Sequence, residues 1–163
     1  MTILTELMSI SIHTDKELFR EAINLTAAET KFSSRLIEKD YFCTVVLEYF
    51  GQTVDELVFK GGTCLAKVHA DFYRLSEDLD FLIPVELDSS RAERRKRIKG
   101  LKEAFKDVAN RIAGVRVTDE IVGANNSTQY IGNLAYDSIL SADPGTIKIE
   151  VSLREPLLTA FQR

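Results

Sequence analysis

The residues with the clearest chemical potential are two aspartates in the run Asp78-Leu79-Asp80. On an extended strand, residues two apart point to the same face, so both carboxylates would project together while Leu79 enters the core. Adjacent carboxylates repel each other, and burial further destabilises their charges unless a cation lies between them. Hard oxygen ligands suit Mg²⁺ or Mn²⁺. Taken alone, the motif is better explained as two acids at an exposed strand end. The neighbouring motifs must therefore decide whether it is a metal site.

A glycine pair precedes the aspartates in the run Lys60-Gly61-Gly62-Thr63, between a predicted strand and a predicted helix. Paired glycines let the backbone approach a ligand closely, and the helix that follows offers free N–H groups and the positive end of its dipole. This pattern is typical of a phosphate-binding turn, although it lacks the longer P-loop motif. By itself, a plain strand-to-helix turn explains it equally well, and Thr63 is a helix cap, a phosphate donor or both.

A third acid, Glu150, lies in a segment from 146 to 153 in which apolar and polar residues alternate. The period of two places Glu150 on the polar face with Lys148 and Ser152, opposite the apolar set. The acid is either exposed to solvent or directed at a site. If this strand pairs beside residues 79–83, Glu150 faces the same cleft as the two aspartates. Three carboxylates with two metal ions form an apparatus for in-line phosphoryl transfer.

The composition is that of an ordinary globular domain, with 163 residues, 45% hydrophobic and 28% charged. Its two cysteines form no disulfide framework and have no zinc-site spacing, which favours a reducing compartment. The N-terminus shows no basic region followed by an apolar run, so no secretory signal is expected. The most apolar stretch, 41–50, is too short to span a bilayer and contains Glu48. We therefore expect a cytoplasmic protein without membrane association.

A net charge of −4 argues against a protein that coats nucleic acid, but it leaves room for a local basic face. Basic residues gather in one predicted helix: Arg91, Arg94, Arg95, Lys96, Arg97, Lys99 and Lys102. Such a run is more often a solvated helix face than a binding surface. Phosphate contact is the less favoured of the two interpretations.

The pattern of elements predicts an α/β (α+β) fold, a mixed sheet flanked by helices. Capping-box spacing at Thr14 and Thr26 predicts helices in the first third, the second running from about 27 to 50 and ending at Gly51. The later elements are expected as a strand at 56–60, a helix at 63–71, a strand at 79–85, a helix at 89–113 and strands at 115–122, 128–139 and 146–153. An N-terminal helical segment (1–54) would pack on a catalytic core (55–163).

Two ordered motifs, Lys60-Gly-Gly-Thr-Cys-Leu65 and Arg74-Leu-Ser-Glu-Asp-Leu-Asp-Phe81, resemble the signature of AbiEii-type nucleotidyltransferases. That family belongs to the DNA polymerase β superfamily and occurs as toxins of bacterial toxin–antitoxin and phage-defence systems. The run Ile37-Glu-Lys-Asp-Tyr41 resembles an N-terminal element of the same family. The likeness covers about residues 35–85, and Glu150 matches a third carboxylate.

The resemblance implies a role for each matched residue. Asp78 and Asp80 would bind Mg²⁺ or Mn²⁺, and Glu150 would position or activate the attacking hydroxyl. The triphosphate would be held by the glycine turn and the residues after the next helix: Lys60, Gly61, Gly62, Thr63, Arg74 and Ser76. Arg74 fits an ion pair with a nearby acid equally well. Family members continue into a helical half that this chain is expected to lack, which puts self-sufficient activity in question.

The leading hypothesis is therefore transfer of a nucleoside monophosphate from an NTP to an acceptor hydroxyl. The resemblance offers the 3′ end of tRNA or another RNA as acceptor and a cognate antitoxin as partner. The alternative is a catalytically inactive module that binds a nucleotide or a partner on the same fold. A phosphohydrolase with a D-x-D motif ranks last, because Arg74-Leu-Ser-Glu before the aspartates and Phe81-Leu-Ile after them do not match its pattern.

Overall fold

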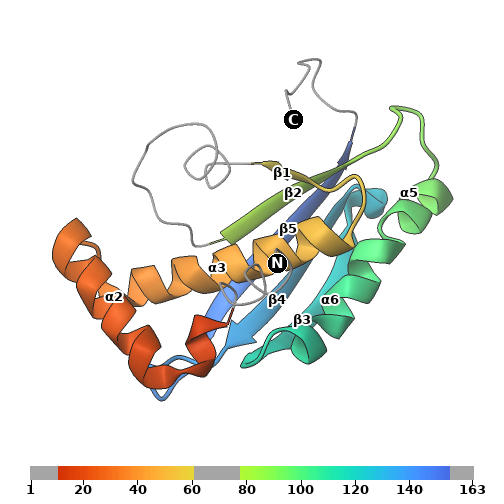
Figure 1. The fold of residues 1–163 in the computed structure, drawn as a ribbon. Coiled ribbons are helices and arrows are strands. Elements are labelled where there is room, and N and C mark those ends of the chain that lie inside the picture. The colour runs from red at the N-terminus through yellow and green to blue at the C-terminus, as the bar shows by residue number, and fades with distance from the viewer. Residues whose placement is uncertain (1–10, 61–77, 155–163) are drawn as a thin grey trace, which may run out of the picture.

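The computed structural model of the chain describes residues 11–60 and 78–154 (Figure 1). Its elements are η1 (Ile12–Thr14), α2 (Lys16–Thr30), α3 (Ser34–Thr53), β1 (Val58–Lys60), β2 (Asp78–Pro84), α5 (Arg91–Arg97), α6 (Lys99–Arg111), β3 (Val115–Ala124), η3 (Asn125–Ser127), β4 (Gln129–Tyr136) and β5 (Gly145–Arg154). In this part of the chain, no helix has the length and apolar character needed to cross a membrane. The predicted helix at 63–71 lies outside the described residues.

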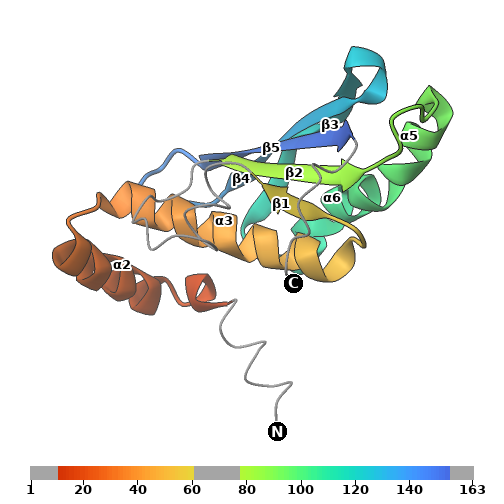
Figure 2. The same ribbon diagram turned by 90° about the horizontal axis from the view of Figure 1, so that it is seen from above.

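The strands form one mixed sheet in the order β1-β2-β5-β4-β3, and they lie side by side in Figure 1. Strands β2 and β5 run parallel, and the other neighbours run antiparallel. Helices α3 and α6 pack on the same side of this sheet, as the view from above shows (Figure 2). The predicted α/β fold, with a mixed sheet and N-terminal helices, is confirmed.

Alternation along β2 and most of β5 divides the sheet into two unlike faces. Leu79, Phe81 and Ile83 of β2 are buried, and they share one core with apolar residues of β5, α3 and α6. Burial of such side chains supplies most of the stability that holds helices on this face. The residues between them, Asp80 and Leu82, are half-buried and lie on the opposite face, here called the open face.

The N-terminal helices begin at other caps than the sequence predicts. The cap of α2 is Asp15, whose carboxylate accepts from the first-turn amides, rather than Thr14. Thr26 lies inside α2, where its hydroxyl donates to a backbone carbonyl one turn back. The chain then leaves helical geometry at Lys31 (φ 65°), and Ser33 caps α3. The helix predicted from about 27 to 50 is therefore divided between the end of α2 and α3, and α3 continues past the glycine expected to end it.

The predicted helix at 89–113 is also two helices, α5 and α6, which meet at Ile98. Ser90 and Glu93 form a reciprocal capping box at the start of α5. The change of axis lets the fully apolar side of α6, including Leu101 and Phe105, pack into the core while α5 remains without a buried residue.

A buried carboxylate ties α3 to the connection between β4 and β5. Glu38 is 1% exposed, and it accepts a hydrogen bond from the Ser138 hydroxyl and another from the Ile139 amide, both at 2.7 Å. The partners are about one hundred residues apart in sequence. Because this connection leads directly into β5, Glu38 helps to fix the strand that carries the third predicted acid.

Replacing Gly145, the first residue of β5, by alanine should destabilise the protein by about 2 kcal/mol. A Cβ at this position would overlap the ring of Tyr136, which cannot retreat because it is buried and stacked on Phe42 with centroids 4.3 Å apart. Gly51→Ala is the matched control, since a Cβ there meets nothing within 4 Å and helix propensity should raise stability by about 0.5–1 kcal/mol. Denaturant unfolding measures both, and equal stabilities would contradict the steric argument.

Candidate active site

The sheet register brings the three predicted acids onto one face. Asp80 of β2 lies directly opposite Glu150 of β5, and Asp78 lies opposite Lys148. Partners in register point to the same side of a sheet, so all of these side chains belong to the open face. The strand with Glu150 is therefore the neighbour of the strand with the aspartates, which is the condition under which Glu150 was expected to share their face.

On the other side of β2, the short strand β1 places Lys60 opposite Asp80. Lys60 is the last residue of β1, so this strand ends beside the acids. The other residues assigned to the triphosphate lie outside the described residues: Gly61, Gly62, Thr63, Arg74 and Ser76. Their contribution to the site stays a prediction.

Asp80 lies in a field that disfavours its negative charge. Partial burial is the main cause that raises the pKa of its carboxyl group, and the charges of Glu150 and Asp78 raise it further. The ammonium groups of Lys60 and Lys148 act in the opposite direction without cancelling the shift. The three acids are thus close enough to repel one another through the protein, and added positive charge at this point would stabilise them.

Lys148 is a member of this cluster that the sequence pattern alone did not assign to the site. Its ammonium is ion-paired with the Glu150 carboxylate, two residues away on the same strand face. Hydrogen bonding to Glu150 and the charge of Glu150 raise the pKa of Lys148, and Asp78 and Asp80 add to the increase. The signal was available in the sequence, because an i, i+2 pair on a strand shares a face.

The donor set suits a hard divalent cation, since it consists of carboxylate oxygens from adjacent, registered strands. Mutual repulsion at Asp80 is the electrostatic condition that such an ion relieves. Within residues 11–60 and 78–154, no three acidic, histidine or cysteine side chains are gathered closely enough to hold a metal ion. Glu150 is turned to Lys148 instead, so it would have to reorient to join the aspartates.

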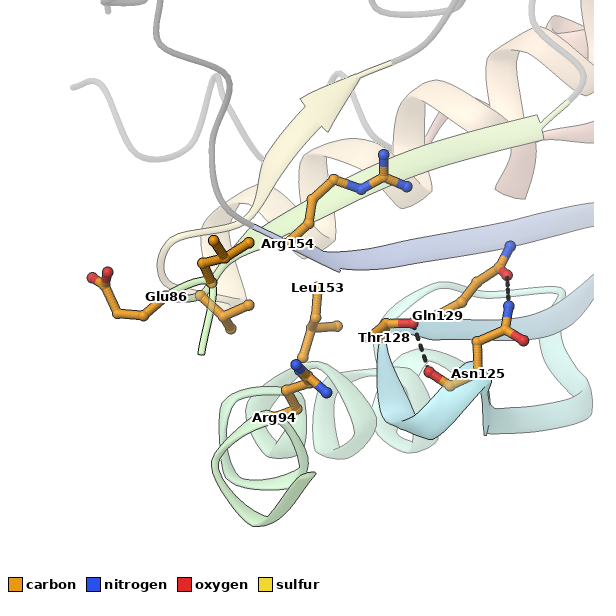
Figure 3. Close-up of a pocket in the computed structure, with 9 residues that line it drawn as sticks. Glu86, Arg94, Asn125, Thr128, Gln129, Leu153 and Arg154 are labelled. Atoms are coloured by element: carbon orange, nitrogen blue, oxygen red, sulfur yellow. Dashed lines mark hydrogen bonds between the residues drawn. The ribbon is translucent and has the colours of Figure 1, made fainter. Parts of the chain in front are cut away.

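A separate hollow of about 440 Å³ opens where β2 and β5 end, away from the acids (Figure 3). It is lined by Val85, Glu86, Leu87, Arg94, Asn125, Thr128, Gln129, Leu153 and Arg154. Arg94 reaches toward Leu153 from α5 and Glu86 points outward, while the Arg154 guanidinium turns back along its strand and donates to the Ser152 hydroxyl. The acids at 78, 80 and 150 are not part of this lining, so the hollow does not extend the candidate active site.

The basic helix is less available for ligands than its composition indicates. Arg94 donates to the Asn126 carbonyl at 3.4 Å, and Arg97 binds both the Glu56 carboxylate at 2.6 Å and the Pro84 carbonyl. Among its neighbours, Lys99 pairs with Glu103, and Lys102 lies over the Tyr130 ring. Arg91, Arg95 and Lys96 are exposed and form no ion pair with the part of the chain that the structure describes.

Residues 37–41 form hydrogen bonds that connect α3 to distant parts of the fold. Besides the Glu38 anchor, the Tyr41 hydroxyl lies 2.8 Å from Nδ1 of His13, whose Nε2 lies 3.0 Å from the Ala113 carbonyl. A carbonyl only accepts, so Nε2 carries the proton and Nδ1 accepts from Tyr41. Burial lowers the pKa of His13, which keeps this neutral form at physiological pH.

Residues 47–163 match the family of nucleotidyl transferase AbiEii toxins of type IV toxin–antitoxin systems. The chain belongs to the AbiEii family. The match covers every strand of the sheet and all three acids, and it begins within α3. The element at 37–41, which also resembles the family, precedes the matched residues.

A solved structure shares the fold of this chain at low sequence identity. A Helicobacter pylori protein described as a nucleotidyltransferase superposes with a TM-score of 0.51 at 20% identity, over 74% of this chain and 46% of that one. JHP933 from the same organism gives 0.49 at 20% identity, over 75% and 45%. The chain thus spans about half the length of these proteins. None of the curated proteins is significantly similar to it.

Proposed function

We propose that this AbiEii chain supplies the catalytic residues for transfer of a nucleoside monophosphate from an NTP to an acceptor hydroxyl. The observation that carries the proposal is the register of β2 with β5, which sets Asp80 opposite Glu150 and Asp78 on the same face. Acids so placed would serve one reacting centre. A cytoplasmic location is part of the same proposal.

Each residue has a distinct task in this scheme. Asp78 and Asp80, with Glu150, would hold Mg²⁺ or Mn²⁺, which when bound stabilises negative charge on the attacking and leaving oxygens. Glu150 would also orient the acceptor hydroxyl, whose oxygen bonds to the α-phosphorus as pyrophosphate leaves. Lys60, beside Asp80, would neutralise the triphosphate as it enters from the glycine turn.

Calorimetric titration of the intact protein with each NTP in the presence of Mg²⁺ tests the nucleotide site. Binding should be measurable in the wild type and absent from the Asp78→Asn, Asp80→Asn double variant. Equal binding in both proteins would overturn the assignment. Incubation with labelled NTPs and total bacterial RNA or protein then distinguishes the two hypotheses for this chain. An enzyme would transfer label to an acceptor, whereas an inactive module would bind NTP without transferring label.

The acceptor that we propose is an RNA 3′ end, and a cognate antitoxin is the expected genetic partner. Three basic residues on α5, Arg91, Arg95 and Lys96, are the exposed candidates for contact with an RNA backbone. An antitoxin gene beside this one would support the toxin role, and its absence from the neighbourhood would weaken it.

Reversing the charge of Arg95 and Lys96 together should weaken tRNA binding and reduce the slope of log K against log salt by about 1 per residue. Arg94 is unsuitable for this test because its substitution also removes the contact with Asn126. The control reverses Lys16 and Lys31, two exposed lysines of the N-terminal helices. If binding at several salt concentrations responds equally to both pairs, α5 has no special role.

A further inference from the structure

Lys148 occupies the centre of the acidic cluster. Its strand position is opposite Asp78, its ammonium is paired with Glu150, and the charges of Asp78 and Asp80 act on it. Lys60 lies beyond Asp80 on the far side of β2. The carboxylates therefore already have a cation of the protein itself beside them.

The Lys148 ammonium and a metal ion compete for the charge of the same carboxylates. One Glu150 oxygen is paired with Lys148, and the positive charge beside it weakens the attraction of the acids for a second cation. One ammonium carries less charge than Mg²⁺ or Mn²⁺, so it balances the acids only in part.

If a metal ion displaced the Lys148 ammonium from Glu150, a phosphate group could become its second partner. The Lys148 side chain is 43% exposed on the open face, so its flexible stem is free to turn without disturbing the core. A triphosphate that lies against the aspartates presents anionic oxygens to the same face. Lysine binds phosphate as a compact point charge with three donors, which tolerates this change of partner.

We propose that Lys148 is a positioning residue with two alternative partners, Glu150 in the nucleotide-free protein and a phosphate of the NTP when a divalent cation occupies the carboxylates. The inference rests on the proposed function. It makes cation and nucleotide binding mutually reinforcing, because the nucleotide draws away the ammonium that hinders the cation.

Two binding measurements on Lys148→Met test the proposal, because they should change in opposite directions. Without nucleotide, Mn²⁺ followed by electron paramagnetic resonance should bind about tenfold more tightly than to the wild type, because the competing charge is gone. With Mn²⁺ saturating, each NTP that binds the wild type should bind about tenfold more weakly by calorimetry. Lys148→Arg should retain most of the NTP affinity. Lys106→Met, which removes an exposed lysine paired with Glu120 on α6 and β3, should change neither value.

A role in folding alone would shift both affinities in the same direction or leave both unchanged, and either result overturns the proposal. Tighter Mn²⁺ binding with unaltered NTP binding overturns it as well, since the second partner would then be wrong. Failure of the proposed function looks different, because the wild type itself would then bind Mn²⁺ and NTP no better than the Asp78→Asn, Asp80→Asn variant. In that case both proposals fall together.

Discussion

The Asp80→Asn variant should lose nucleotidyl transfer by about a thousandfold or more and should nevertheless unfold at a slightly higher temperature than the wild type. Activity falls because a neutral amide cannot hold a divalent cation at the site as a carboxylate does. Stability rises because partial burial and the charges of Glu150 and Asp78 oppose ionisation of Asp80 in the folded protein. Solvent screening keeps this gain small, about 1–2 °C at neutral pH.

The pH dependence fixes the sign of the effect. The folded protein raises the pKa of Asp80 above its unfolded value, so the folded state binds the proton more tightly. The favourable contribution is complete below the unfolded pKa, near 4, and it is lost as the pH rises through the folded pKa. The stability advantage of Asp80→Asn should therefore be present at pH 7 and should shrink as the pH falls toward 4.

Thermal unfolding between pH 4 and pH 8, with label transfer assayed in parallel, measures both halves of this prediction. Asp143→Asn is the control, because it removes an equal charge from an exposed loop and should leave transfer unchanged. A full rate of transfer by Asp80→Asn would exclude Asp80 from the chemistry. If the difference in melting temperature between Asp80→Asn and the wild type grew at low pH, the charge of Asp80 would be favourable in the folded protein.

The sequence predicted those features that depend on local periodicity. Alternation in β2 and β5 predicted the buried apolar residues of both strands correctly, although Ser152, expected on the polar face, is buried as well. Whether Asp80 and Glu150 share a face depended on the pairing of the two strands, which the pattern did not give. The division of the chain at residue 54 stays a prediction, as do the roles of the site residues.

The features that the sequence analysis missed depend on contacts between distant segments or on competition between neighbouring side chains. Asp15 accepts hydrogen bonds from two first-turn amides and Ser33 from one, so these two residues cap the helices. Sequence spacing alone did not distinguish them from the nearby threonines that were predicted as caps. The bend at Ile98 follows from packing of α6 on the sheet, which the helical period does not encode. From the sequence, Lys148 was only one of several polar residues on its strand, and the strand register shows that it lies among the acids.

Glu38→Ala should be the most destabilising single substitution that we propose, with a loss of about 3 kcal/mol in the free energy of unfolding. The Glu38 carboxylate, 1% exposed, is the acceptor for the Ser138 hydroxyl and the Ile139 amide. Alanine would leave both part-buried donors without this partner and would open a space beside α3. The expected fall in melting temperature is about 6–12 °C.

Two further variants separate hydrogen bonding from the mere loss of a charge. Glu38→Gln retains the shape and one acceptor oxygen for the Ile139 amide. Its NH₂ group cannot accept from the Ser138 hydroxyl, whose oxygen already accepts from the Leu140 and Ser141 amides, so Glu38→Gln should lose less stability than Glu38→Ala but more than none. Glu48→Ala removes the same side chain from another position of α3, where it accepts from Gln52, and should cost about 0.5 kcal/mol or less. Equal losses for Glu38→Ala and Glu48→Ala would contradict the anchor. Because the connection held by Glu38 leads into β5, Glu38→Ala should also weaken NTP binding at the strand that carries Glu150, although Glu38 does not line the site.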